Sequence, residues 1–292
     1  MQIINNLKIE YLRHNSKINS FYKKWPDWKR LIEELIDEKD LSNSIFNLGD
    51  KLSQIFLSTR ESGRSQSSLA SGGTAWECLV MWYLNLVFWN TNVFALRQNN
   101  NFVPKIINNI LTVTFGNNRT NTESDILLFT IPDHKNFKYH GLQNLNFYLQ
   151  NKLKDLDLMV LQCKTNWNDN AQIPMLWDAI YRTKEFRFPG IDIGIEGVSP
   201  SSIRNFSYSF VTVPSNNKND FKYDSTSVLR VRNLSGGNYW GKYSKEDIAK
   251  SIKELPGNKF SGSFEGGVIS HIKKNIESDK TFLKKFLDLN WY

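Results

Sequence analysis

The chain has 292 residues, 40% of them hydrophobic, and its 37 Lys and Arg residues against 29 Asp and Glu residues give it a net charge of +8. This composition excludes an intrinsically disordered chain and is typical of one globular unit of enzyme size. The positive charge suits a polyanionic partner such as nucleic acid, and it equally suits a protein that only needs solubility.

Other sequence features limit the location and the chemistry. The longest apolar run, at residues 78–89, is interrupted by Asn85 and is too short to span a bilayer. The first residues, MQIINNLKIEYLRHNSK, contain no secretory signal, so we expect a cytoplasmic protein with no membrane partner. The glycines form neither a phosphate-binding loop nor a dinucleotide fingerprint, which argues against an ATPase or an oxidoreductase.

Residues 1–60 are predicted to form a helical N-terminal region. Pro26 opens a segment whose apolar residues recur at helical spacing, and a second helix is expected at residues 41–57. Residues 60–73 are rich in Ser and Gly. They form either a linker or a DNA-contacting loop in which Arg60 and Arg64 read phosphates or bases.

The next segment, residues 71–89, carries apolar residues around almost the whole circumference of a helix, so this helix should be buried. Glu77 lies in its first turns. A buried carboxylate is costly unless it is paired, protonated or bound to a metal ion, which makes Glu77 a candidate site residue. Alternatively, Glu77 is only favoured there by the macrodipole at the start of the helix.

Three strands are predicted further along the chain. Residues 110–116 and 124–132 are expected to pair as a hairpin across NNRTNTE, the segment that contains Arg119. Residues 157–164 should lie beside the second strand of this hairpin. The intervening residues 133–155 are expected to form a loop and a helix.

Polar residues stand at the ends of two of these apolar strands. Asp125 lies at the start of the second strand, and the third strand ends in Gln162, Cys163 and Lys164. Side chains alternate along a strand, so Gln162 and Lys164 point to one face and Cys163 to the other. A buried strand rarely ends with an amide beside an ammonium group unless something polar lies there.

The buried helix with its Glu, the strand that starts with an Asp and the strand that ends in Gln-x-Lys together resemble the core of the PD-(D/E)xK nuclease superfamily. The resemblance is to the variant with Gln in place of the second acid, and it covers about residues 71–190. It implies an α/β fold in which helices flank a central mixed β-sheet. The catalytic residues that it implies are Asp125, Gln162, Lys164 and Glu77.

The resemblance also implies a divalent metal, Mg²⁺ with Mn²⁺ as a substitute. Asp125 would be its principal ligand, together with the backbone carbonyl of Cys163, and Glu77 would supply the negative charge that Gln162 lacks. Lys164 would orient or deprotonate the attacking water and offset the charge that develops on the phosphate.

The chain departs from the family pattern in one respect. The insertion at residues 133–155 separates Asp125 from Gln162, where many members have only a tight hairpin. Asp157 is therefore a nearer acid. It alternates to the opposite face from Gln162, however, which favours Asp125 as the metal ligand.

Basic and amide side chains are predicted to make further DNA contacts, because Arg reads guanine and Asn reads adenine in the major groove. Two Asn residues lie at the entrance of a helix that is expected after Lys164. Two Arg residues lie on one face of a strand expected at residues 227–234, and the other candidates lie in loops, some of them flanked by Gly. A further strand is expected at residues 206–215, and helices are expected at residues 265–287. Helix capping and plain turns account for several of these residues equally well. The candidates are Arg60, Arg64, Arg119, Asn166, Asn168, Arg230, Arg232 and Asn238.

These features divide the chain into an N-terminal helical region at residues 1–60, a catalytic core at residues 61–215 and a C-terminal region at residues 216–292. The function that the resemblance implies is that of a type II restriction endonuclease acting as a homodimer on double-stranded DNA. Two alternatives stay open. One is another nuclease of the superfamily, such as an Mrr-like enzyme, and the other is a non-catalytic DNA-binding protein whose site has decayed.

Overall fold

The computed structural model describes residues 2–59, 66–98, 101–121, 124–165, 187–188, 191–213, 222, 224–235, 239–241 and 250–289. Some predicted features lie outside these residues: Arg60, Arg64, Asn238 and the helix expected after Lys164, with Asn166 and Asn168. Within the described residues, no helix combines the length and the hydropathy of a membrane span.

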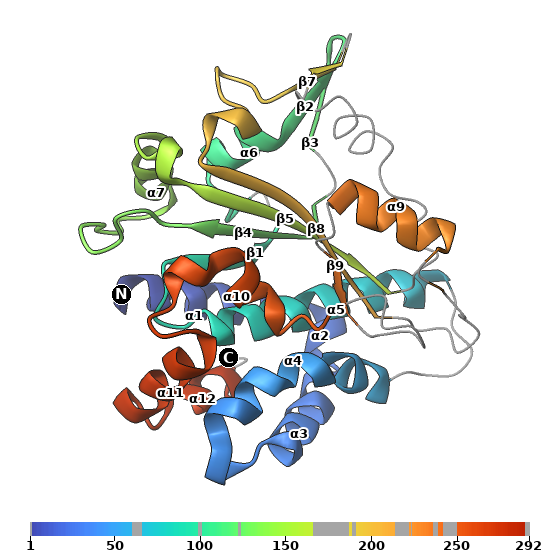
Figure 1. Ribbon diagram of the computed structural model, residues 1–292, viewed down its shortest axis with the longest axis vertical. Helices are drawn as coiled ribbons and strands as arrows, with labels where there is room; N and C mark the ends of the chain where they lie inside the picture. The colour runs from blue at the N-terminus through green and yellow to red at the C-terminus, as the bar shows by residue number, and fades with distance from the viewer. Residues whose placement is uncertain are drawn as a thin grey trace.

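A mixed five-stranded sheet forms the centre of the protein, with the strand order β1-β4-β5-β8-β9 (Figure 1). Its strands are β1 (Val93–Arg97), β4 (Ile126–Thr130), β5 (Asp157–Lys164), β8 (Asn205–Thr212) and β9 (Tyr239–Gly241). The first three pair antiparallel, and β8 and β9 continue the sheet in parallel with β5. The predicted α/β fold class is thus confirmed, as are the strand at residues 206–215 and the neighbouring positions of β4 and β5.

Helices from both ends of the chain pack together below this sheet in Figure 1. The N-terminal helices are α1 (Gln2–Ser16), α2 (Asn19–Tyr22), α3 (Trp25–Leu35) and α4 (Leu41–Ser58), which confirms the predicted helical region. The C-terminal helices are α10 (Glu254–Phe260), α11 (Val268–Ser278) and α12 (Phe282–Leu287). The indole N–H of Trp25 donates to the carbonyl of Leu287 at 3.3 Å, so the two groups share one core.

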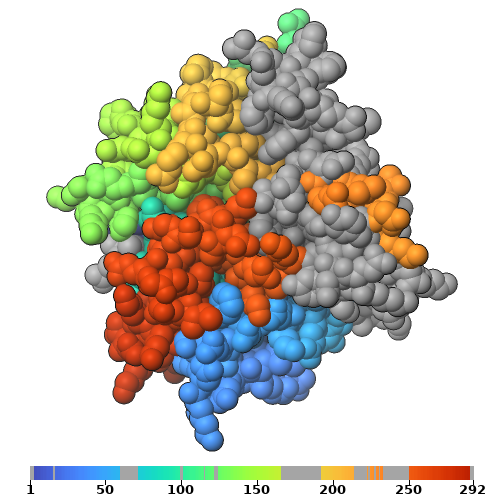
Figure 2. Space-filling view, in the orientation of Figure 1, coloured from blue at the N-terminus to red at the C-terminus, as the bar shows by residue number. Residues whose placement is uncertain are grey.

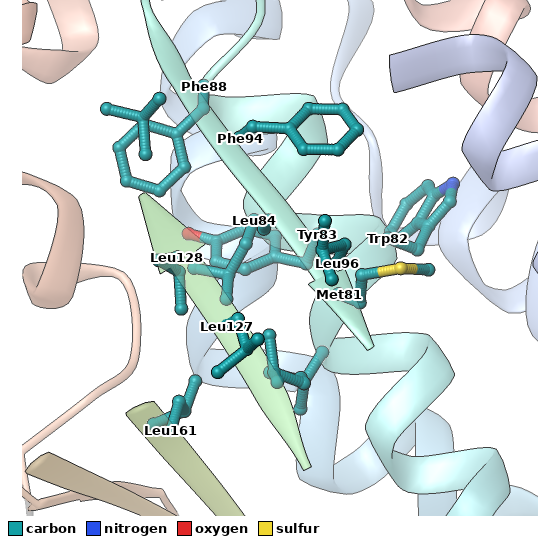
Figure 3. Packing of buried hydrophobic residues seen from close by; sticks show 14 of the residues in the cluster. Met81, Trp82, Tyr83, Leu84, Phe88, Phe94, Leu96, Leu127, Leu128 and Leu161 are labelled. Carbon is teal, nitrogen blue, oxygen red and sulfur yellow. The ribbon is translucent and has the colours of Figure 1, made fainter. Parts of the chain in front are cut away.

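The central helix of this layer is α5 (Gln66–Val87). Residues from several sides of α5 are buried, and Figure 3 shows Met81 close to Leu96 of the sheet and Leu84 close to Leu127 and Leu128. Truncating a large buried aromatic side chain in such a core costs about 3–5 kcal/mol. The packing therefore holds α5 firmly against the strands that carry the candidate site.

The start of α5 corrects two predictions. Because the helix begins at Gln66, Glu77 lies eleven residues inside it and not in its first turns, so the macrodipole at the helix start does not account for this acid. Residues 66–73 form the first turns of the helix and are neither a linker nor a loop. Ala favours a helix and Gly disfavours it, but once the buried part of a helix has formed, each added residue gains a hydrogen bond without a new nucleation cost. Composition alone therefore did not mark the boundary.

A second, four-stranded sheet with the order β3-β2-β7-β6 lies above the central sheet in Figure 1. It contains β2 (Thr112–Phe115), β3 (Asn118–Asn121), β6 (Arg187–Phe188) and β7 (Ile191–Ile193), and α6 (Lys105–Leu111) leads into β2. The predicted hairpin between residues 110–116 and 124–132 is therefore wrong. β2 turns back at once through Gly116, whose φ of 55° suits glycine, and pairs with β3. All five residues of β4 are buried, and this strand fills a central position between β1 and β5 instead.

Two further segments complete the fold. The insertion at residues 133–155 contains a loop and α7 (Leu142–Gln150), as predicted. The predicted strand at residues 227–234 is instead a helix, α9 (Thr226–Ser235), which packs on β8. Val228 and Val231, three residues apart, are both fully buried, so the helical spacing of these two side chains overrode the local alternation. Arg230 and Arg232 consequently do not share a strand face.

Candidate active site

The positions of the candidate residues follow from the register of β4 against β5. Ile126 is the partner of Leu161, so continuing the antiparallel register by one residue places Asp125 opposite Gln162. Residues opposite each other project to the same face of a sheet. Asp125, Gln162 and Lys164 therefore start from one face of the sheet at the C-terminal end of β5, as the sequence predicts.

The side chain of Asp125 makes a specific contact at this position. Its Oδ2 accepts a hydrogen bond from the backbone N–H of Cys163 at 2.7 Å. On β5 the next carbonyl, that of Lys164, accepts from Val213 on the opposite side, at the end of β8. Since the N–H and the carbonyl of one strand residue point to the same side, the carbonyl of Cys163 points toward Asp125. A carboxylate and a main-chain carbonyl are thus directed to one place.

Burial differs among the residues at the end of β5. Gln162 is fully buried, whereas Lys164 and Asp125 are partly exposed. The thiol of Cys163 is buried and lies on the opposite face, and burial raises its pKa well above the ordinary value. The two charged groups are therefore accessible to solvent, whereas the amide of Gln162 is not.

Glu77 reaches this region from α5. Its Oε2 accepts a hydrogen bond from Nε of Arg97, at the end of β1, at 2.8 Å, and lies 2.7 Å from Nη2 of the same guanidinium in an ion pair. Arg97 is in register with Ile126, so it projects from the face of the sheet that carries Cys163. Glu77 therefore approaches the end of β5 from the face opposite to Lys164, and Asp125 lies between the two strands that carry Arg97 and Lys164.

The charges of these groups influence one another. The pKa of Glu77 is raised to about 7, mainly by burial and also by the negative charge of Asp125. The positive charges of Arg97 and Lys164 oppose this shift. Glu77, Asp125, Arg97 and Lys164 therefore form one electrostatic cluster with two basic and two acidic groups. We call these four residues the charged cluster.

Sequence reasoning missed Arg97. The available signal was the apolar run VFAL that ends in this Arg, a pattern similar to the strand that ends in Lys164. The buried carboxylate of Glu77 required a partner, and among the described residues Arg97 supplies the ion pair. Pairing was one of the three ways in which we expected the cost of this buried carboxylate to be offset, and the ion pair with Arg97 provides it.

Asp157, the alternative acid, lies far from the charged cluster. It begins β5, seven residues before Lys164, and at about 3.3 Å per residue the strand separates the two by roughly 23 Å. Its carboxylate is bound by Arg204, with Oδ1 at 2.8 Å from Nε, and by the side-chain amide of Asn205 at 2.8 Å. The geometry thus assigns Asp157 to an ion pair at the opposite end of the strand.

The predicted DNA-binding residues that the structure describes do not belong to the charged cluster. Arg119 is exposed on β3 of the second sheet, and Arg230 and Arg232 lie on α9. A cavity of about 930 Å³ lies at the C-terminal end of α5, between α1 and α12. Residues such as His14, Trp89 and Lys284 line it, and none of the candidate catalytic residues does.

The oxygen groups available to a metal are few. Within the described ranges, no three His, Cys, Asp or Glu side chains converge in a geometry suited to a metal ion. The charged cluster offers two carboxylates, and the carbonyl of Cys163 adds one further oxygen on the side of Asp125. Comparisons with protein-family models, with curated proteins and with solved structures found no match to this chain.

Proposed function

We propose that this protein is a Mg²⁺-dependent endonuclease that hydrolyses double-stranded DNA and leaves 5′-phosphate and 3′-hydroxyl ends, in the manner of a type II restriction endonuclease. The observation that carries the proposal is the hydrogen bond from the Cys163 N–H to Asp125, which joins the end of β5 to the start of β4. Lys164, the last residue of β5, belongs to the same charged cluster. An acid, a main-chain carbonyl and an ammonium group are the components that metal-assisted phosphodiester hydrolysis requires.

The donor set fits Mg²⁺ in chemistry, because this ion takes one or two carboxylates, accepts neutral carbonyl oxygens and retains several waters. Asp125 and the carbonyl of Cys163 would hold it. Glu77 would add the second negative charge through Oε1, since the hydrogen bond and the ion-pair contact from Arg97 both end on Oε2. Bound there, Mg²⁺ would polarise the scissile phosphate and offset its charge.

The protein's own residues have separate tasks in this proposal. The ammonium group of Lys164 orients the attacking water and offsets charge on the phosphate as the bond breaks. The backbone of Cys163 fixes the carboxylate of Asp125, so that no reorganisation is needed when substrate binds. The buried amide of Gln162 lies on the same face of β5 as Lys164 and adds no charge there.

The proposal extends to the partners. The net charge of +8 favours association with the phosphate backbone, and the residues proposed to contact DNA include Arg119, Arg230 and Arg232. Cutting both strands of a duplex needs two sites, so we propose a homodimer whose two-fold axis matches that of the DNA. The proposed site of action is the cytoplasm, where foreign DNA enters.

Digestion of phage DNA tests the proposal. Purified protein is incubated with phage DNA in Mg²⁺, in Mn²⁺ and in excess EDTA, beside the Lys164→Ala variant. Discrete fragments in Mg²⁺ that are absent in EDTA and with the variant would support a sequence-specific endonuclease. A smear would indicate a nuclease of low specificity, and intact DNA at every condition would reject the proposal.

A further inference from the structure

The second sheet carries a two-stranded ribbon formed by β2 and β3, which we call the β2–β3 ribbon (residues 112–121). Six consecutive residues at its tip and along β3, residues 116–121, are exposed. Their sequence, GNNRTN, contains three amides, one guanidinium and one hydroxyl, and no carboxylate or large apolar group. The outer strand thus presents hydrogen-bonding side chains to solvent along its whole length.

The base of the ribbon is held firmly. Val113 is fully buried, and the hydroxyl of Thr112 donates to the side-chain carbonyl of Asn121 at 2.8 Å. On its other side β2 pairs with β7, which leaves β3 at the edge of the sheet. Figure 1 shows the ribbon rising away from the central sheet, and Figure 2 shows its tip projecting at the top of the molecule. A rigid base with an exposed polar edge suits insertion into a groove.

The ribbon is also close to the charged cluster in sequence. Asn121 precedes Asp125 by only four residues, so β3 leads directly to the candidate metal ligand. Arg119 lies six residues before Asp125, and a chain of six residues spans at most about 20 Å. Since successive base pairs are about 3.4 Å apart, Arg119 would contact DNA within roughly six to eight base pairs of the phosphate at Asp125.

The chemistry of Arg119 favours base contacts. Within the described part of the chain no acidic group forms an ion pair with Arg119. The carboxylate of Glu196 interacts with Arg119 only electrostatically and is bound by Lys105 at 2.8 Å and by Asn109 at 2.9 Å. The major groove is about 12 Å wide and admits a two-stranded ribbon, and the guanidinium can bind O6 and N7 of guanine with two hydrogen bonds. Amides such as Asn118 suit adenine in the same groove.

We propose that the β2–β3 ribbon enters the major groove beside the cleaved phosphate and that Arg119 is a specificity-determining residue that reads a base edge there. This inference rests on the proposed function, because it assumes that DNA is bound at the charged cluster. It goes further by separating recognition from catalysis: the ribbon selects the sequence, and the charged cluster cuts it.

Binding selection tests the inference independently of cleavage. Wild type, Arg119→Ala, Arg119→Lys and the control Arg30→Ala are each mixed with duplexes that contain a randomised segment, in EDTA, and the bound DNA is sequenced. Arg30 is an exposed Arg of α3, in the part of the molecule opposite to the ribbon in Figure 1. The same four proteins then cut the selected duplex in Mg²⁺, which locates the cut relative to the preferred bases.

We expect Arg119→Ala to lose the preference at one or two adjacent base pairs, with the ratio of affinities for selected and scrambled DNA falling about 10- to 100-fold. Arg119→Lys should lose the same preference while it retains overall affinity, because Lys keeps the charge without the planar fork. An unchanged preference in Arg119→Ala, a uniform loss of affinity on all sequences, or no selected sequence for the wild type would overturn the inference. Selection without any cleavage would instead reject the proposed nuclease function and leave the reading role of Arg119 supported.

Discussion

The carboxylate of Asp125 accepts a hydrogen bond from the backbone N–H of Cys163, at 2.7 Å. The antiparallel ladder between β4 and β5 ends at Ile126 and Leu161, so this side chain provides the next acceptor in place of a strand carbonyl. The bond ties the acid to the strand that carries Lys164. It gives Asp125 a structural task beside the proposed catalytic one, and the two can be separated by substitution.

Asp125→Asn should separate them. The amide oxygen of Asn can accept the hydrogen bond from Cys163, so the free energy of unfolding should change by no more than about 1 kcal/mol. The negative charge is lost, and with it the principal attraction for Mg²⁺. We therefore expect the single-turnover cleavage rate to fall at least about 100-fold, while affinity for DNA in EDTA is retained. Urea unfolding, binding and cleavage measured on one preparation check all three.

Asp157→Asn is the matched control. This acid lies at the other end of β5 and is bound by Arg204, with its side chain partly exposed. A partly exposed ion pair contributes about 1 kcal/mol or less, so the variant should fold and cut DNA at the rate of the wild type. An inactive Asp157→Asn beside an active Asp125→Asn would show that the metal ligand is wrongly assigned.

Lys164→Ala should abolish cleavage and leave DNA binding largely intact, because one ammonium group is a small part of the phosphate contacts but is central to the chemical step. Lys154→Ala removes an exposed Lys near the start of β5 and serves as a control for charge. Both variants carry the same net charge, so a salt-dependent loss of binding would affect them equally. Cleavage by Lys164→Ala at the control rate would remove Lys164 from the mechanism.

The pKa of Glu77 predicts a pH dependence of stability. Burial and the charge of Asp125 raise this pKa to about 7, above the ordinary value of about 4.3 in an unfolded chain. The folded protein therefore holds the proton more tightly, and the contribution of Glu77 to stability is fully present below about pH 4 and is lost as pH rises through about 7. Glu77→Gln cannot ionise, so it should not show this loss.

Urea unfolding in EDTA between about pH 5 and pH 8 measures the effect. The free energy of unfolding of Glu77→Gln relative to wild type should rise with pH by about 2 kcal/mol, which allows for the partial exposure of the pair with Arg97. The difference between the two proteins cancels the other titrating groups. Parallel curves would mean that Arg97 holds Glu77 ionised throughout this range.

A double substitution tests whether Glu77 replaces the acid that β5 lacks. Glu77→Ala should cut slowly at low Mg²⁺, since it removes one of the two carboxylates of the charged cluster. Gln162→Glu places a carboxylate on the face that Asp125 occupies, and because Gln162 is fully buried the variant should unfold more easily in EDTA and regain stability in Mg²⁺.

Combining the two changes should recover part of the cleavage lost in Glu77→Ala. The cycle is read from the Mg²⁺ dependence of cleavage for the two single variants and the double variant. Strictly additive losses would indicate that Glu77 serves only the ion pair with Arg97, on the Cys163 face of the sheet.

Elements that are buried on all sides were predicted correctly from the sequence, because their residues are apolar at almost every position. The run that ends in Lys164 and the apolar helix around Met81 are recognisable locally, because nearly every position is inside the core. The neighbouring positions of β4 and β5 were also predicted despite the long insertion between them, because both segments are apolar runs of the kind that fill the centre of a sheet.

The partners of short strands, and the choice between helix and strand in ambiguous segments, could not be predicted from the local sequence pattern. β2 has only four residues, and its choice of β3 over β4 depends on the turn at Gly116 and on β7, which lies far along the chain. The segment around Val228 and Val231 satisfies both a strand and a helix period, and packing on β8 decides between them. Arg97 was missed because its importance appears only when α5 folds against β1 and brings Glu77 to it.

The most direct measurement of the central claim is the single-turnover rate of phage DNA cleavage by wild type and Asp125→Asn across a Mg²⁺ titration, with EDTA as the starting point. We predict no cleavage in EDTA, a rate for wild type that rises with Mg²⁺ to saturation, and no measurable cleavage by Asp125→Asn at any concentration although it binds the same DNA. Cleavage by wild type that is undiminished in EDTA, or equal rates for the two proteins, would contradict the assignment of Asp125 and Cys163 to a metal-dependent nuclease site.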